Sequence, residues 1–112
     1  MLFIGNFNHR PNKDAVHYFV KKIFPLLQRR IKHLKFYVVG SNMPEEITAY
    51  NSEDIAVLGY VPNVDALFHD SRVFVTPLRY GAGMKSKVGQ ALSYGLPVVT
   101  TTIGAEGIGL PT

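Results

Sequence analysis

The 112-residue sequence contains no cysteine, which excludes disulfide bonds and thiolate metal sites as sources of stability. No apolar run approaches the roughly 20 residues that a membrane-spanning helix needs. The opening segment, Met1 to Asn6, lacks the basic region and the long apolar region of a secretory leader. We therefore expect a chain that is not exported and that works in the cytoplasm.

Several ligand-binding motifs are missing as well. No Gly-Lys pair occurs, so the phosphate-binding loop of P-loop NTPases is absent. Asn6 and Asn8 stand where a receiver domain would need clustered acids at the end of its first strand. The sequence contains four scattered histidines, His9, His17, His33 and His69. Because no two of them have the spacing of metal ligands, we expect no metal site.

Short apolar, β-rich segments alternate with segments of helical periodicity. Strands are predicted at Leu2–Ile4, Phe36–Val39, Ile55–Leu58, Val73–Thr76 and Pro97–Thr100. Helices are predicted from about Asn12, with Asn12 as a candidate cap, and at Pro44–Tyr50, Val64–His69 and Ser86–Tyr94. Pro25 should kink the first helix or begin another one.

This alternation is typical of βαβ crossovers and predicts an α/β, doubly wound, Rossmann-like fold with a parallel sheet of about five strands. If the strands follow the common order 3-2-1-4-5, a ligand should lie at the carboxyl ends of the first and fourth strands. The loops at that position are Asn6–Pro11 and Leu78–Lys87. The loop after the third strand, Gly59–Pro62, should lie at the same edge of the sheet.

The segment Pro77–Lys87, with the sequence PLRYGAGMKSK, places small residues and two lysines between a strand and a helix. Backbone N–H groups and the helix dipole would favour an anion there, and Lys85 and Lys87 would add positive charge. Arg79 is a third candidate. The alternative is a tight turn with solvated lysines. A dinucleotide site fits poorly, because its GxGxxG motif normally follows the first strand and Ser86 replaces the last glycine here.

Positive charge is concentrated in one part of the chain, whose net charge is +4. The cations in question are Lys21, Lys22, Arg29, Arg30, Lys32 and Lys35. Apolar residues stand between them, which favours the solvated face of an amphipathic helix. Nucleic acid or an anionic membrane surface is the alternative, but for this domain we expect contact with neither.

Three segments in order, FIGNFNHRPNKDAVHYFV, LGYVPN and PLRYGAGMKSKVGQALSYGLPVVTT, resemble the nucleotide-sugar-binding domain of GT-B glycosyltransferases. More narrowly, the chain is similar to the group 1 (GT4) family over nearly its whole length. Gln90–Thr100 matches that family's E-A-(M/L)-x-x-G-x-P-V-V-(A/T) pattern in order and spacing. The resemblance implies transfer of a hexose from a UDP- or GDP-sugar to an unidentified acceptor, with retention and without a metal.

The resemblance also implies roles for individual residues. The donor diphosphate would be held by Gly5, Asn6, Gly83, Lys85 and Lys87. The base is expected beside Tyr60 and Val61. The ribose is expected at Gln90, where the family usually has a glutamate, and a second family glutamate is replaced by Ala82. Glutamine can hydrogen-bond a diol but carries no charge. A degenerate nucleotide-binding module without catalysis is therefore the alternative, and a nucleic-acid surface is a less favoured one.

Family members place an acceptor-binding domain before this one, whereas here the first strand begins at Leu2. We expect residues 1–112 to be a truncated donor-binding domain, natural or engineered, that transfers little sugar by itself. The family also continues with a further strand. The segment Val98–Thr101 should then be an exposed edge strand, which could pair with a second copy.

Overall fold

The computed structural model describes residues 1–80 and 85–101, and at residues 85 and 86 it describes the backbone alone. The strands are β1 (Leu2–Ile4), β2 (Phe36–Val39), β3 (Ile55–Gly59), β4 (Phe74–Thr76) and β5 (Val98–Thr100). They form one parallel sheet in the order β3-β2-β1-β4-β5. The prediction of a doubly wound α/β fold with this strand order is confirmed.

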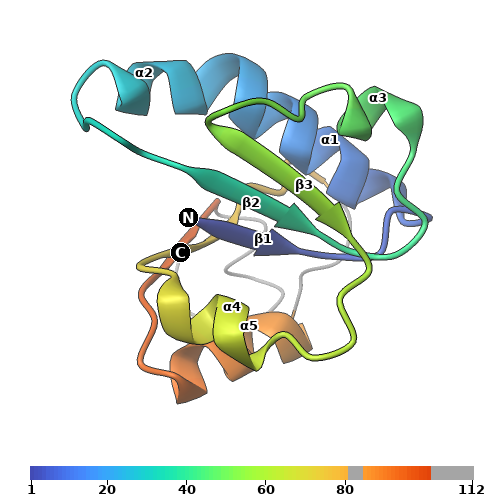
Figure 1. Cartoon of the computed structure of the whole chain (residues 1–112). Helices are drawn as coiled ribbons and strands as arrows, with labels where there is room; N and C mark the ends of the chain where they lie inside the picture. The colour runs from blue at the N-terminus through green and yellow to red at the C-terminus, as the bar shows by residue number, and fades with distance from the viewer. Residues whose placement is uncertain (81–84, 102–112) are drawn as a thin grey trace.

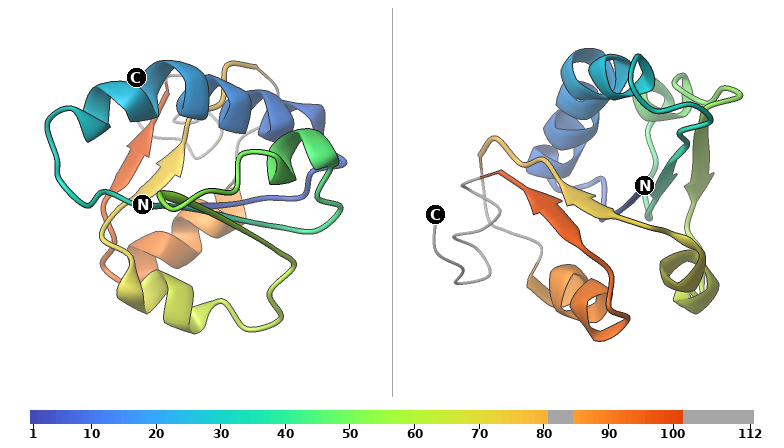
Figure 2. Two further views of the ribbon diagram at one scale, coloured as in Figure 1. Left: turned by 45° about the horizontal axis from the view of Figure 1, so that its top comes forward. Right: turned by 90° about the vertical axis from the view of Figure 1, so that its left-hand side faces the viewer.

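The helices are α1 (Arg10–Tyr18), α2 (Phe24–Gln28), α3 (Glu45–Thr48), α4 (Asp65–Asp70) and α5 (Lys85–Ser93), and a π-helical turn, η1 (Phe19–Ile23), joins α1 to α2. One face of the sheet is covered by α1, α2 and α3, and the other by α4 and α5 (Figures 1 and 2). The five strands and the helices α3, α4 and α5 each begin and end within two residues of the positions that the sequence predicts.

The first helix begins earlier than predicted. His9 is the residue before its first turn, Pro11 lies within that turn, and Asn12 is inside the helix with 5% of its surface exposed. The prediction that Asn12 caps this helix is therefore wrong. Pro11 explains the difference, because a proline needs no hydrogen-bond acceptor in the first turn and its fixed φ suits the start of a helix.

Pro25 restarts the helix, as predicted. Proline has no N–H to donate to the carbonyl of residue 21, and its ring would clash with that carbonyl in a regular helix. The wider turn η1 relieves this conflict, since the Phe24 N–H donates to the carbonyl of Phe19, five residues back. α2 then begins with Pro25 in its first turn.

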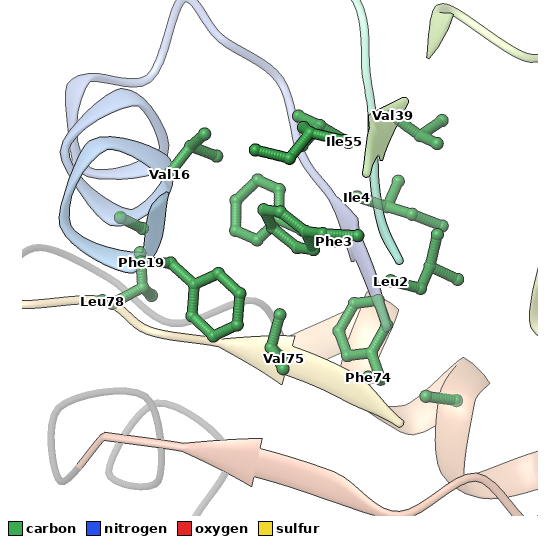
Figure 3. Close-up of a cluster of buried hydrophobic side chains, with 14 of the residues drawn as sticks. Leu2, Phe3, Ile4, Val16, Phe19, Val39, Ile55, Phe74, Val75 and Leu78 are labelled. Atoms are coloured by element: carbon green, nitrogen blue, oxygen red, sulfur yellow. The ribbon is translucent and has the colours of Figure 1, made fainter. Parts of the chain in front are cut away.

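Apolar side chains fill the space on both faces of the central strands, and all residues of β1 and β4 are buried (Figure 3). On the α1 side, the ring of Phe19 packs against Phe36 of β2 with 4.6 Å between centroids. On the other side, Phe68 of α4 stacks on Phe74 of β4 at 5.8 Å. Helices thus pack on both faces of the sheet, and this packing fixes the positions of the strand ends from which the loops at the carboxyl edge begin.

Candidate functional site

The strand order brings the loops after β1 and β4 together at the carboxyl edge of the sheet. β1 and β4 are neighbours, with Leu2 opposite Phe74. The loop after β1 leads into α1, and the loop after β4 leads toward α5. A crevice between two such loops is where ligands bind in doubly wound sheets.

Asn6 organises the loop after β1. Its Oδ1 accepts hydrogen bonds from the Asn8 backbone N–H at 2.9 Å and from Asn42 Nδ2 at 3.0 Å. Its backbone carbonyl accepts from Asn12 Nδ2 at 2.9 Å. The Nδ2 group of Asn6 makes no hydrogen bond within the described part of the chain, so it remains a donor that a ligand oxygen could use.

Gly5 has a steric role in this loop. Its N–H donates to the carbonyl of Val39 at 3.0 Å and is not available to a ligand. A Cβ on Gly40, after β2, would lie 1.7 Å from the carbonyl oxygen of Gly5, and a Cβ on Gly5 would lie 2.8 Å from Asn12 Nδ2. The absence of side chains at both positions lets the two loops pack directly on each other.

Two helix N-termini at this edge have cations in their first turns, and of these Lys13 Nζ lies 3.7 Å from Glu46 Oε1. α1 has no side-chain cap and no acidic residue in its first turn, where Arg10 and Lys13 stand instead. The first turn of α5 also lacks acids and contains Lys85 and Lys87. Because the dipole makes a helix N-terminus positive, cations there are unfavourable unless an anion is near. Both ends therefore suit a phosphate group.

Lys87 and Gln90 lie on one face of α5, because residues three apart in a helix are neighbours. Both are partly buried, and the Gln90 side chain makes no hydrogen bond within residues 1–80 and 85–101. The predicted sites at Gly83 and at the family position Ala82 lie outside the described residues, as does the side chain of Lys85.

Arg79 is already paired and does not project freely toward a ligand. Its Nε and Nη2 donate to the two carboxylate oxygens of Asp14 on α1 at 2.9 and 2.5 Å. Its guanidinium also lies 4.8 Å from the ring centroid of Tyr18. The hydrogen bond from Arg79 lowers the pKa of the Asp14 carboxyl below its ordinary 3.8. Arg79 therefore ties the loop after β4 to α1.

The loop after β3 reaches the same edge through a left-handed turn. Gly59 has a φ of +68°, and its carbonyl accepts from the Gly40 N–H at 2.8 Å. Tyr60 follows with 70% of its surface exposed, and Val61 is half-buried. An exposed aromatic ring beside a half-buried apolar residue offers a surface on which a flat base could stack.

The sequence did not reveal the role of Asn12, whose polar character and place after a proline suggested a cap. Its Oδ1 and the Oγ1 of Thr76, at the end of β4, are buried and find no hydrogen-bond partner among the described residues. Buried polar atoms are nearly always paired in native proteins, so unpaired ones call for an explanation. Asn12 lies in the first turn of α1 and Thr76 ends β4, so both lie near the carboxyl edge of the sheet.

No three His, Cys, Asp or Glu side chains in ranges 1–80 and 85–101 gather in a way that could hold a metal ion. Within the same ranges, no helix has the length and apolar character to cross a membrane.

A family model described as "Glycosyl transferases group 1" matches residues 1–109. The chain belongs to the group 1 glycosyl transferases. This group 1 glycosyl transferase chain is also similar to "Uncharacterized 44.6 kDa protein in cps region" of Klebsiella pneumoniae, with 25% identity over an alignment 118 positions long that covers 97% of the chain. It spans 30% of the length of that relative. The predicted resemblance to group 1 is thus confirmed at the level of the family.

Proposed function

We propose that this domain binds a UDP- or GDP-activated hexose at the carboxyl edge of its sheet and presents it for transfer, with retention, to an acceptor held by another part of the full enzyme. The observation that carries the proposal is the pair of helix N-termini, α1 and α5, that have cations and no acids in their first turns. A diphosphate supplies the negative charge that this arrangement lacks.

The protein's own groups can stabilise the leaving diphosphate. Lys87 supplies a full positive charge, and the Asn6 amide and the N-terminus of α1 supply hydrogen-bond donors. We assign Lys85, Gly83 and the backbone near Gly5 to the same region on the strength of the family resemblance. Fixed donors of this kind stabilise the charge that develops as the sugar–phosphate bond breaks, and we expect no metal to be needed.

The remaining parts of the donor are assigned by position. Tyr60 and Val61 would take the base, because they follow β3 at the same edge. Gln90 would contact the ribose, because it shares a face of α5 with Lys87. The chain alone should bind donor yet transfer little sugar, since transfer requires an acceptor held in position.

Isothermal titration calorimetry with UDP, GDP and ADP tests this proposal. We expect binding of UDP or GDP, and Lys87→Ala should weaken it roughly tenfold or more, because a charge-assisted hydrogen bond contributes about 1.5–3 kcal/mol. The matched control is Arg30→Ala, which removes an exposed cation from the far end of the helix layer and should leave affinity unchanged. No heat with any of the three nucleotides at millimolar concentration would contradict the proposal.

A degenerate module is the second candidate, and the uncharged, unpaired Gln90 favours it. Gln90→Glu separates the two. If the wild type scarcely binds and Gln90→Glu restores binding, the site has decayed. If the wild type binds and Lys87→Ala weakens binding, the site is functional.

A further inference from the structure

The cations noted in the sequence form one surface, which we call the basic end. It comprises Lys21, Lys22, Arg29, Arg30, Lys32 and Lys35, of which the first two lie on η1 and the other four between α2 and β2. All six are exposed, and none forms an ion pair with a described residue. No acidic residue occurs between Asp14 and Glu45, so this segment carries six positive charges in a chain whose net charge is +4.

Two large apolar side chains are exposed among these cations. Leu26 of α2 has 57% of its surface exposed, and Ile31, in the turn after α2, has 49%. Leu26 lies three residues before Arg29, the C-cap residue of α2, so the two share a face of that helix. Leu26 and Ile31 thus lie next to cations in the sequence and are exposed to solvent with them.

An apolar groove of about 890 Å³ opens beside the basic end. Its lining includes apolar helix residues such as Ile23 and Leu27 and apolar strand residues such as Val75 and Val99. Lys32, His33, Lys35 and Arg72 also line it, and Asp70 is the one acid among the described residues that do. The groove therefore combines apolar side chains with several cations.

The basic end lies opposite the candidate donor site. α1 begins at the carboxyl edge of the sheet, and α2 ends near the point where β2 begins (Figure 1). The groove runs from Met1 and Val73, which precede β1 and β4, along the sheet to Pro77 and Thr101, which follow β4 and β5. The cations of the basic end lie at its amino end, beside Met1 and Val73. Occupation of the basic end should therefore not compete with a nucleotide.

We propose that the basic end and its groove form a contact surface for an anionic lipid bilayer. Lipid headgroups complement the cations, and acyl chains complement Leu26, Ile31 and the groove. Nucleic acid would satisfy the cations alone, because phosphate contacts gain nothing from exposed aliphatic side chains. The charge pattern alone favoured a solvated helix face without membrane contact, and the exposed apolar residues and the groove are the observations that favour the bilayer.

Vesicle flotation tests the proposal with the chain as it stands. At about 50 mM salt, the protein should bind vesicles that contain phosphatidylglycerol and should not bind vesicles of phosphatidylcholine alone. The double variant Arg29→Ala, Arg30→Ala should bind roughly 10- to 30-fold more weakly, because each cation near an anionic surface contributes about 1 kcal/mol. The matched control, Arg10→Ala with Lys13→Ala, removes two cations from the opposite edge and should bind as the wild type does.

The apolar part of the surface has its own variant. Leu26→Ser with Ile31→Ser should weaken vesicle binding roughly tenfold. Leu92→Ser, which changes a leucine of α5 that is 53% exposed, should not. Circular dichroism checks that each variant is folded.

Lack of binding to phosphatidylglycerol vesicles by the folded wild type would overturn the proposal. Binding to single-stranded RNA would also overturn it, if that binding is at least as strong as vesicle binding and is unchanged in the variant Leu26→Ser with Ile31→Ser. That outcome would assign the surface to nucleic acid. Lys87→Ala and added UDP or GDP should leave vesicle binding unchanged. The failure of this proposal is thus distinguishable from the failure of the proposed donor site.

Discussion

At the scale of single residues, the contact between Gly5 and Gly40 shapes the candidate site. A Cβ at position 40 would meet the backbone oxygen of Gly5 at 1.7 Å, which no rotamer change can relieve. Gly40→Ala should therefore push the loop after β1 outward and lower the free energy of unfolding by about 1–3 kcal/mol. Urea denaturation measures this, and calorimetry should show weaker nucleotide binding in the same variant.

Gly89 provides the matched control for this prediction. It lies in α5, it is exposed, and a Cβ there would have no neighbour within 4 Å. Gly89→Ala should raise the free energy of unfolding by about 0.5–1 kcal/mol, because alanine is the better helix former. Equal effects of the two substitutions would show that the loops after β1 and β2 are not packed as described.

The ion pair between Asp14 and Arg79 makes stability depend on pH. Because Arg79 lowers the pKa of Asp14 below 3.8, the folded protein binds this proton less readily than the unfolded chain does. The stabilisation is then complete above about pH 4 and is lost as the pH falls through the folded-state pKa. Asp14→Asn should be less stable than the wild type near pH 6, and the difference should shrink toward about pH 2.5.

Urea midpoints across this pH range measure the effect, and a double-mutant cycle isolates it. Arg79→Ala should reproduce the loss of stability. The double variant should lose less stability than the sum of the two single losses, since both substitutions break the same pair. A difference between wild type and Asp14→Asn that stays constant from about pH 6 to pH 2.5 would contradict this account.

At the scale of elements, most of the fold could be predicted because its signals are local. Short segments rich in aromatic and β-branched residues, such as Phe36–Val39, indicate buried strands, and helical periodicity fills the intervals between them. Pro25 marked a helix restart for a reason contained in its own covalent structure. Asn12 was misjudged because its environment depends on a loop that precedes it and on strands that lie far away in the sequence.

The candidate site was less predictable than the fold, since its contacts join distant elements. Arg79 could be recognised as a cation, but its partner Asp14 lies 65 residues away, and the pairing appears only once α1 sits beside the loop after β4. The exposure of Leu26 and Ile31 is likewise a tertiary property. Residue type indicated which chemistry was present, whereas topology decided which of these groups remain available to a ligand.

At the scale of the whole molecule, positive charge is divided between the two ends of the sheet. Lys87 and the N-termini of α1 and α5 lie at the carboxyl edge, and the basic end lies beyond the amino ends of the strands (Figure 1). The two sets of cations are therefore suited to different anions. The two proposals concern opposite ends of the domain, which makes the two binding measurements independent tests.

The edge of the sheet at β5 yields the last prediction. No strand within the described residues pairs with its outer side, and Val99 at its centre is 58% exposed. An apolar edge strand with free backbone groups tends to pair with another copy. We expect a dimer in light scattering at high protein concentration, and Val99→Lys should return it to a monomer, since a charged edge residue opposes pairing. Leu92→Lys adds the same charge at a similarly exposed site on α5 and should leave the dimer intact. A monomeric mass for the wild type at high concentration would show that this edge does not pair.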